Sequence, residues 1–346
     1  IMHKELGKDN RTRFWQRERY MKIQDEVKQA VATAISEHDF KHVEWIAAGG
    51  SYGGFYPADY FMTHEATVLS SRMHPSNEFV FAPPATLGES TICIVCSMRG
   101  TKETCEAARI AKDHGAYVIA IYVEESQLTE VCDQKIKYES IALDESKTER
   151  VNSSVGLLIA ANLVNQTEGY ARMNEMEMAF DQVDSLYREA VVRTTPIAQT
   201  WAQLVKDAPT IYVMGSGPAY GSAYIFSICN IEEMLQKSSP TINSCEFFHG
   251  PFEVLVNEDP IFQLVSYGRC RPADMRAVNF LSTYAAEKTF VLDAVDLGIT
   301  ELPEEVAEYF NHVLFSPILN NVFMRELSKA TGKDYMTRTY MWKVPY

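Results

Sequence analysis

The stretch CEFFHGPFEV, residues 245–254, contains a histidine whose position suits acid–base chemistry. His249 follows two phenylalanines and directly precedes Gly250-Pro251, a pair typical of a turn. A histidine of the core more often lies inside a helix or strand, with its ring nitrogens hydrogen-bonded. An imidazole that a ligand can reach titrates near neutrality and can transfer protons. His249 is therefore a candidate general acid or base. Glu246 is a candidate partner for this ring or for a ligand, with a plain solvent-exposed role as the alternative.

The segment CSMRGTKET, residues 96–104, has the composition of a phosphate-binding loop. It follows an apolar run and precedes a helical pattern, so free backbone amides at the start of the helix would face an anion. The groups that could surround a phosphate are the hydroxyls of Ser97, Thr101 and Thr104, the backbone at Gly100, the guanidinium of Arg99 and, from the neighbouring GGSY segment, Gly50 and Ser51. Plain helix capping by serine and threonine is the alternative.

Composition and charge narrow the classes of ligand. The chain has 346 residues and a net charge of −14, from 32 basic and 46 acidic residues. Such a charge disfavours binding to nucleic acid or anionic membranes. Affinity for a phosphate must therefore come from hydrogen-bond donors and positive charge close to the phosphate itself. Neither a GxxxxGK(S/T) loop nor a convincing GxGxxG fingerprint is visible, which disfavours nucleotides. The seven cysteines form no CxxC pair. They predict reduced thiols in a cytoplasmic protein without a metal site or cofactor.

Apolar runs that alternate with helical patterns predict a doubly wound α/β fold with parallel sheets. WIAAGGSYGG (45–54) and YVMGSGPAYGSAY (212–224) each follow a strand with glycines and a Tyr-Gly pair, which indicates an internal duplication. The predicted elements are a helix over 12–37, strand–turn–helix units at 42–61 and 210–237, a strand–loop–helix–strand unit at 90–123, helices over 150–207, strands at 260–268 and 288–295, and helices over 303–330 interrupted at Pro317. The predicted division is an N-terminal helix (1–40), a first domain (41–165), a helical bridge (166–207) and a second domain (208–346).

The two glycine-containing turns and the 96–104 loop resemble the sugar isomerase (SIS) domain, here in tandem. The chain is most similar to the bacterial fructosamine 6-phosphate deglycases, with the tightest match at EFFHGPFE (246–253) and RTYMWKVPY (338–346). The family loop reads Ser-x-Ser-Gly-x-Thr. Here Ser97-Met98-Arg99-Gly100-Thr101 is one residue shorter, with arginine in place of serine. Which hydroxyl meets the phosphate, that of Thr101 or that of Thr104, therefore stays open.

The resemblance also implies the catalytic pair. In the family a glutamate base lies 16 positions before the histidine of the HGP turn, which corresponds here to Glu233 and His249. In an Amadori compound a proton must leave the amine-bearing carbon and another must arrive at the adjacent keto carbon. One carboxylate can carry that proton, and an imidazole can serve the oxygen atoms. The Glu232–Glu233 pair reads alternatively as the acidic face of a helix.

Two further residues are weaker candidates. His312 lies among apolar residues in YFNHVLF, where a hydrogen-bonded core histidine is the default and an active-site role is the alternative. Lys343 lies in a C-terminal tail that lines the pocket in relatives, and a solvated lysine is the alternative.

The hypothesis favoured by these residues is a deglycase that releases hexose 6-phosphate and a free amino acid. An aldose–ketose isomerase or an amino-sugar-phosphate deaminase on the same scaffold is the main alternative, and a non-catalytic sugar-phosphate sensor is the third. We also expect a homodimer. Phe247, Phe248 and Phe252 would be exposed on the turn of a lone domain, and exposed aromatic clusters usually mark contacts. In relatives the HGP turn lies near a subunit interface, so His249 would serve its own or the partner chain's site.

Overall fold

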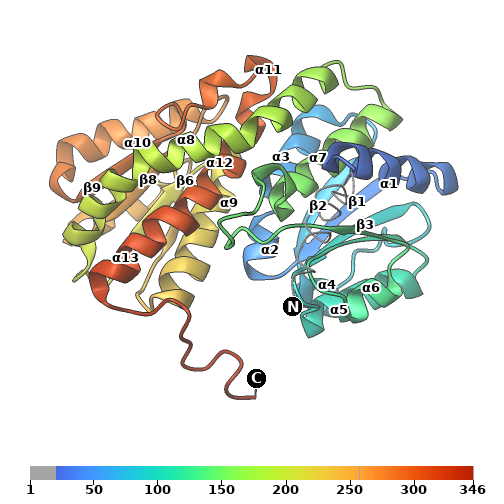
Figure 1. Ribbon diagram of the computed structural model, residues 1–346, viewed down its shortest axis with the longest axis horizontal. Helices are drawn as coiled ribbons and strands as arrows, with labels where there is room; N and C mark the ends of the chain where they lie inside the picture. The colour runs from blue at the N-terminus through green and yellow to red at the C-terminus, as the bar shows by residue number, and fades with distance from the viewer. Residues whose placement is uncertain (1–20, 257, 346) are drawn as a thin grey trace, which may run out of the picture.

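The computed structural model describes residues 21–256 and 258–345, which form two α/β units side by side (Figure 1). Every strand pair in both sheets is parallel, as predicted. The first sheet has the order β2-β1-β3-β4-β5 and the second β7-β6-β8-β9. The first sheet contains β1 (His42–Ala47), β2 (Ser70–Pro75), β3 (Thr91–Ser97), β4 (Tyr117–Tyr122) and β5 (Gln134–Lys137); the second contains β6 (Tyr212–Gly215), β7 (Thr241–Asn243), β8 (Ile261–Val265) and β9 (Thr289–Asp293).

The two units repeat one topology. In each, the first strand of the unit is flanked by the second and the third, and the fourth strand follows the third. This shared order agrees with the duplication that the two glycine turns indicate. Parallel strands need crossover connections, and helices supply them on both faces of each sheet.

The helices of the first unit begin after the strand ends that carry the candidate phosphate groups. α2 opens at the glycine turn after β1, and α5 opens at Lys102 after the loop that follows β3. α4, α5 and α6 cover one face of the sheet, and α1, α3 and α7 pack in the core on its other face. Their bounds are α1 (Ile23–Glu37), α2 (Gly49–Gly53), α3 (Tyr56–Glu65), α4 (Ser76–Phe81), α5 (Lys102–Asp113), α6 (Gln127–Val131) and α7 (Asn152–Thr167).

The second unit begins with the long helix α8 (Met173–Val205), which crosses the top of the molecule (Figure 1). After β6 the chain forms α9 (Gly217–Ile225) and continues directly into a π-helical segment, Phe226–Met234. The remaining helices are α10 (Arg271–Tyr284), α11 (Glu304–Ala307), α12 (Asn311–Ile318), a second π-helical segment (Leu319–Phe323) and α13 (Met324–Thr331). Among the described residues no helix combines the length and the apolar character that a membrane crossing requires.

The main elements lie where the sequence predicts them, and three edge strands do not appear among the predictions. β2, β5 and β7 consist mostly of polar residues or adjoin proline, so they lack the apolar runs of the central strands. A turn at residues 168–172 divides the predicted helical stretch 150–207 into α7 and α8. Pro317 lies inside α12 and does not interrupt it; the change to π geometry comes at Leu319. The predicted helix over 12–37 is described from Ile23, and residues 12–20 lie outside the described residues.

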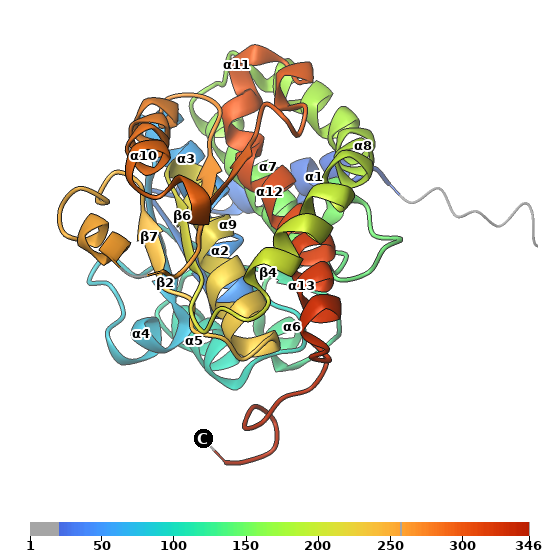
Figure 2. The ribbon, with the colours of Figure 1, turned by 90° about the vertical axis from the view of Figure 1, so that its left-hand side faces the viewer.

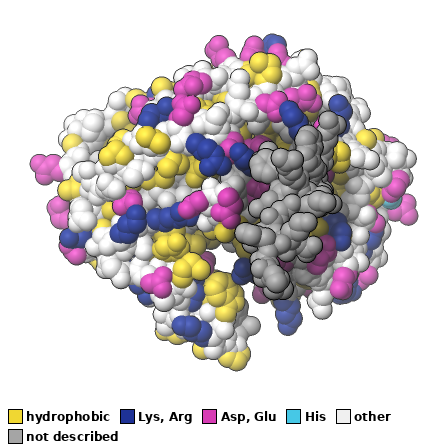
Figure 3. Space-filling view, in the orientation of Figure 1, with side chains coloured by type: hydrophobic (Ala, Val, Ile, Leu, Met, Phe, Trp, Pro, Cys, Tyr) yellow, Lys and Arg dark blue, Asp and Glu magenta, His cyan; other side chains and the backbone are white. Residues whose placement is uncertain are grey.

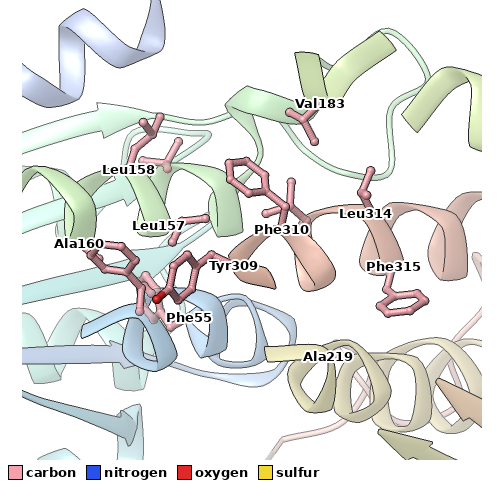
Figure 4. Close-up of a cluster of buried hydrophobic side chains, with 14 of the residues drawn as sticks. Phe55, Leu157, Leu158, Ala160, Val183, Ala219, Tyr309, Phe310, Leu314 and Phe315 are labelled. Carbon is pink, nitrogen blue, oxygen red and sulfur yellow. The ribbon is translucent and has the colours of Figure 1, made fainter. Parts of the chain in front are cut away.

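One hydrophobic core joins the two units. The same cluster of buried side chains contains residues of β1, β3 and α7 from the first unit and of α8, α12 and α13 from the second. Tyr309 and Phe310, which precede α12, lie among side chains of α7 and α8 (Figure 4). The Tyr309 ring contacts Phe61 with centroids 4.9 Å apart, and the Phe310 ring contacts Phe180 at 4.8 Å. The units therefore share their packing instead of meeting at a hydrated interface.

The two Tyr-Gly pairs of the repeated motif lie against each other at this junction. A Cβ added at Gly221 of α9 would lie 2.6 Å from the carbonyl oxygen of Gly53, and one added at Gly53 would lie 2.4 Å from Ile225. On either side of this contact the rings of Tyr52 and Tyr224 lie 6.0 Å apart, and those of Tyr56 and Tyr220 lie 5.6 Å apart. Glycine is required here for the close approach of two helices.

Candidate functional site

The last residue of β3 organises the candidate phosphate loop. Ser97 is buried, and its Oγ accepts a hydrogen bond from the backbone N–H of Thr101 at 2.9 Å. The Thr101 hydroxyl lies 3.2 Å from the same oxygen, and Thr101 itself is exposed at the start of α5. Gly100 between them has φ +72°, and a Cβ there would lie 2.4 Å from Ser126 Oγ. The turn thus requires glycine, and it leaves the first amides of α5 at an open end of the sheet.

Thr104 and Arg99 have partners of their own. Thr104 is fully buried, and its hydroxyl lies 2.8 Å from that of Ser76, at the start of α4. Arg99 is exposed and donates from Nε to Glu124 at 2.9 Å. Of the two threonines, Thr101 has the hydroxyl at the surface of the loop, and Thr104 ties α5 to α4.

Ser51 and Gly50 lie at the carboxyl end of β1, next to the β3 loop. β1 and β3 pair in register, with Ala47 opposite Cys96, so the residues that follow each strand emerge at one edge. Ser51 hydrogen-bonds to the Cys96 thiol and to the Tyr138 hydroxyl. Burial raises the pKa of the Cys96 thiol to about 12, against the opposing effect of its hydrogen bonds, so this cysteine is a neutral packing group.

Glu233 lies in the π-helical segment that continues α9, in the wall of a cavity of about 700 Å³. π-helical turns widen a helix locally and often occur at functional sites. Asn230, three residues earlier, donates from Nδ2 to Asn320 Oδ1 at 2.8 Å, so the two π-helical segments are joined to each other. The residues that line the cavity are Gly49, Ile228, Cys229, Glu232, Glu233, Gln236, Arg338, Thr339, Tyr340 and Met341.

Cys229 connects this cavity to the turn after β1, which lies beside the candidate phosphate loop. Its sulfur would lie 3.6 Å from a Cβ at Gly50, and it accepts a backbone hydrogen bond from that residue. Burial and the negative charge of Glu233 raise the pKa of the Cys229 thiol to about 12. The turn after β1 thus touches the helix that carries Glu233, and the two candidate parts of the site adjoin within one chain.

The two neighbouring glutamates differ in surroundings. Glu232 is exposed and accepts a hydrogen bond at Oε1 from the backbone N–H of Ser239 at 3.1 Å. Glu233 is partly buried and accepts a hydrogen bond from Arg338 Nε of the C-terminal tail at 2.8 Å, with Arg338 Nη2 in ion-pair contact at 2.7 Å. The carboxylate that the resemblance selects is therefore the one held in the cavity wall.

His249 is exposed on the turn after β7 and does not line the Glu233 cavity. Figure 2 shows this loop at the left edge of the molecule, away from α13 and the tail. Glu246 is exposed too, and its carbonyl oxygen accepts a hydrogen bond from the backbone N–H of His249 at 3.0 Å. Within one described chain the structure does not bring Glu233 and His249 together.

The aromatic residues of the HGP turn pack within the chain, contrary to the expectation that a lone domain exposes them. Phe247 is fully buried, and the ring of Phe248 lies 5.4 Å from that of Phe280 in α10. Phe252 joins the same cluster, and Arg276 lies over the Phe248 ring at 4.2 Å. α10 supplies the cover that the turn by itself could not indicate.

The two weaker candidates also have defined places. Lys343 is exposed in the tail that projects below the body of the molecule in Figures 1 and 2. His312 lies in the core between α12 and α9, with Nδ1 3.0 Å from Ser222 Oγ and a second hydrogen bond to the backbone of Pro218. Burial lowers the pKa of its imidazole to about 3, so the ring is neutral.

Sequence reasoning did not single out Arg338, Ser76 or Asn230. Arg338 lies within the motif RTYMWKVPY, so a signal was present, but nothing in the local sequence indicates that its partner is 105 residues away. Ser76 and Asn230 make hydrogen bonds across elements that only the packing brings together.

The neutral His312 predicts a specific acid sensitivity. An unfolded histidine has a pKa near 6.5, so between about pH 6.5 and 3 the unfolded chain binds a proton that the folded chain does not. The stabilisation that comes from keeping His312 neutral is therefore present above pH 6.5. It is lost as the pH falls below that value, by up to about 1.4 kcal/mol of unfolding free energy per pH unit. Urea unfolding of the wild type and His312→Gln at pH 7 and pH 5 should show the wild type losing about 2 kcal/mol more than the variant. Equal losses would contradict the buried, neutral ring.

Comparison with known proteins defines the family of this fold and site. No family model matches the chain. The chain is 31% identical over 327 residues to the fructosamine deglycase FrlB of Bacillus subtilis (strain 168), covering 94% of this chain and 98% of that protein. It is 20% identical over 275 residues to the fructoselysine 6-phosphate deglycase of Escherichia coli (strain K12), covering 78% of each. A crystal structure from Salmonella typhimurium LT2, assigned as a phosphosugar isomerase, superposes with a TM-score of 0.90 at 35% identity, over 94% of this chain and 100% of that one. The chain therefore belongs to the fructosamine deglycase family, whose members are built on the tandem sugar isomerase (SIS) fold.

Proposed function

We propose that this protein is a deglycase that cleaves a conjugate of a hexose 6-phosphate and an amino acid into hexose 6-phosphate and the free amino acid. The observation that carries the proposal is the placement of Glu233 in a cavity wall whose helix touches the turn after β1 through Cys229 and Gly50. An acid–base group beside a phosphate-binding edge suits a phosphorylated substrate that reacts at carbon. The names of the similar proteins from Bacillus subtilis and Escherichia coli support the same reaction class.

In this proposal the phosphate lies at the start of α5. Thr101 offers an exposed hydroxyl, Ser97 shapes the turn, and the first amides of α5 face the anion. Hydrogen bonds to a charged group are stronger than neutral ones, so a few can hold a dianion despite the net charge of −14. Arg99, engaged with Glu124, contributes positive charge at the rim instead of a direct contact.

Glu233 then acts as the proton carrier. After the sugar ring opens, its carboxylate removes a proton from the amine-bearing carbon and returns a proton to the adjacent keto carbon. The two electrons of the broken C–H bond form the enolamine double bond, and reprotonation at the keto carbon leaves a C=N imine. Water adds to that imine carbon, and the C–N bond breaks to release the amine and leave an aldehyde. No electrons are gained or lost overall, so the sequence of steps needs no redox partner.

His249 would complete the site from a second copy of the chain. Its ring is exposed and outside the Glu233 cavity, so a contribution to that cavity requires a neighbouring subunit. A two-fold symmetric dimer would place each His249 turn opposite the partner's cavity and form two composite sites. The imidazole would handle oxygen-bound protons during ring opening and enolisation.

Purified protein should release free amino acid from at least one of fructoselysine, glucoselysine and fructose-asparagine 6-phosphate. Glu233→Gln should lower kcat by about 10²–10⁴-fold, because the amide cannot carry the proton. The matched control is Glu232→Gln, which should stay within about tenfold of wild type because Glu232 bonds to a backbone amide instead. Conversion of a simple ketose 6-phosphate, with no release from any conjugate, would instead identify an isomerase.

Removing the Ser97 hydroxyl should weaken phosphate binding. Ser97→Ala removes the acceptor that holds the Thr101 N–H, so Thr101 shifts and its hydrogen bond to the phosphate is lost. The loss of a hydrogen bond to a charged group costs about 1.5–3 kcal/mol, so KM should rise about 10- to 100-fold while kcat changes less. Steady-state kinetics with the phosphorylated conjugate measure the effect, and Ser282→Ala, at an exposed position of α10, is the matched control. Equal turnover of the dephosphorylated conjugate by the wild type would show that the loop only caps α5.

Mixing two inactive variants tests the shared site. In a heterodimer of Glu233→Gln and His249→Asn, one composite site has both substitutions and the other has neither, so activity should return to about half of the sites per heterodimer. Activity after subunit exchange, with exchange followed by differential labelling, measures this. Exchange without recovery would assign both residues to one chain, and a monomer in light scattering would exclude the dimer.

A further inference from the structure

The C-terminal tail is fastened to the Glu233 helix by one arginine. Arg338 donates from Nε to Glu233 Oε1 at 2.8 Å, and its Nη2 lies 2.7 Å from the same oxygen as an ion pair. Its Nη1 donates to the carbonyl oxygens of Tyr335 at 2.6 Å and Thr337 at 3.1 Å. The guanidinium is buried, with 8% of the Arg338 side chain exposed. A buried cation with every nitrogen engaged is a fixed part of the structure and is not available as a further ligand for substrate.

A second tie fastens the tail nearby without touching Glu233. Gln236 donates from Nε2 to Thr339 Oγ1 at 2.8 Å and accepts at Oε1 from Lys333 Nζ at 2.7 Å. Gln236 has φ +58°, and Trp342, whose ring lies 5.6 Å from the Arg338 guanidinium carbon, has φ +61°. Within residues 21–256 and 258–345 these are the two non-glycine residues with positive φ. Strain of this kind persists only where the surroundings hold it, and it often occurs at functional sites.

The contacts of Arg338 are unequal for the two carboxylate oxygens. Its hydrogen bond from Nε and its ion-pair contact from Nη2 both end on Oε1, and no hydrogen bond between described residues ends on Oε2 of Glu233. A carboxylate that is held by one oxygen has a defined orientation and keeps lone pairs on the other oxygen for a proton. Transfer of a proton from carbon requires such an arrangement, because misplacement by about 1 Å can cost about 10²-fold in rate.

We propose that Arg338 is a positioning residue for catalysis, which holds Glu233 by Oε1 so that Oε2 receives the carbon-bound proton. Because Arg338 also bonds to the backbone of Tyr335 and Thr337, docking of residues 335–338 and assembly of the proton carrier become one event. This inference rests on the proposed function of Glu233. The competing interpretation is that Arg338 only anchors the tail, whose exposed hydrophobic side chains are visible at the bottom of Figure 3.

The test uses Arg338→Met and Arg338→Lys, each alone and combined with Glu233→Gln, on the conjugate that the wild type cleaves best. Arg338→Met should lower kcat about 10²-fold or more, with KM within about threefold. Arg338→Lys should recover part of that loss, since an ammonium group can reach Oε1 with a single bond but not with a fork. In the Glu233→Gln background Arg338→Met should cost less than about threefold more, because two residues that act as a unit are not additive.

Two further measurements separate positioning from anchoring. With substrate deuterated at the amine-bearing carbon, the isotope effect on kcat should grow in Arg338→Met, because proton transfer from carbon becomes slower. Lys333→Ala is the matched control: it breaks a tail contact that does not involve Glu233, so its kcat and isotope effect should stay near those of the wild type.

Four outcomes would overturn the inference. Additive losses in the double variant, or an unchanged isotope effect in Arg338→Met, would reduce Arg338 to a tail anchor and leave the proposed function intact. If Arg338→Met does not fold, full activity in Arg338→Lys with a wild-type isotope effect would have the same meaning. A wild type that cleaves none of the conjugates would overturn the proposed function, and this inference with it.

Discussion

The close approach of α9 to the turn after β1 is the constraint on which the site depends. Gly53 and Gly221 meet where a Cβ on either would overlap a neighbour, and the two Tyr–Tyr ring contacts flank this point. A Cβ at Gly221 would lie 2.6 Å from the Gly53 carbonyl oxygen, so a larger residue there would force the two segments apart. That separation would act on everything that α9 continues into, including the π-helical segment and Glu233. The shared core of Tyr309 and Phe310 reinforces the contact, because dense packing transmits small displacements.

Consecutive residue contacts lead from this close approach to the site, and they involve three parts of the sequence. Gly50 of the first unit touches Cys229, Cys229 lies beside Glu233, and Glu233 is held by Arg338 of the tail. Each link is short, and the three parts are α2, the π-helical segment that carries both Cys229 and Glu233, and the tail. The distances between the turn after β1, Glu233 and the tail are therefore set by how the two units and the tail pack. His249 makes none of these contacts, so the proposal that it acts with Glu233 requires a second copy of the protein.

Much of the fold could be predicted from local pattern. The central strands β1, β3, β4, β6 and β8 are apolar runs followed by glycine-containing or polar turns, and such runs identify buried parallel strands directly. The edge strands β2, β5 and β7 could not be predicted in the same way, because a strand that pairs on one side needs few apolar residues. The packing of α10 over Phe247 could not be predicted either, because the sequence of a turn does not indicate which later helix packs on it.

The sequence by itself determined the repeated α/β plan, the loop chemistry at Ser97–Thr101 and, through a family motif, the identity of Glu233 and His249 as candidates. These follow from local patterns of residue type and spacing, which are readable without any distance. Only the tertiary structure decided that Thr104 bonds to Ser76, that Arg99 pairs with Glu124, that His312 lies neutral in the core and that Arg338 holds Glu233. The physical reason is that a hydrogen-bond partner or a degree of burial depends on which elements pack together. Contacts across 25 to 105 residues of chain leave no periodic trace in the sequence.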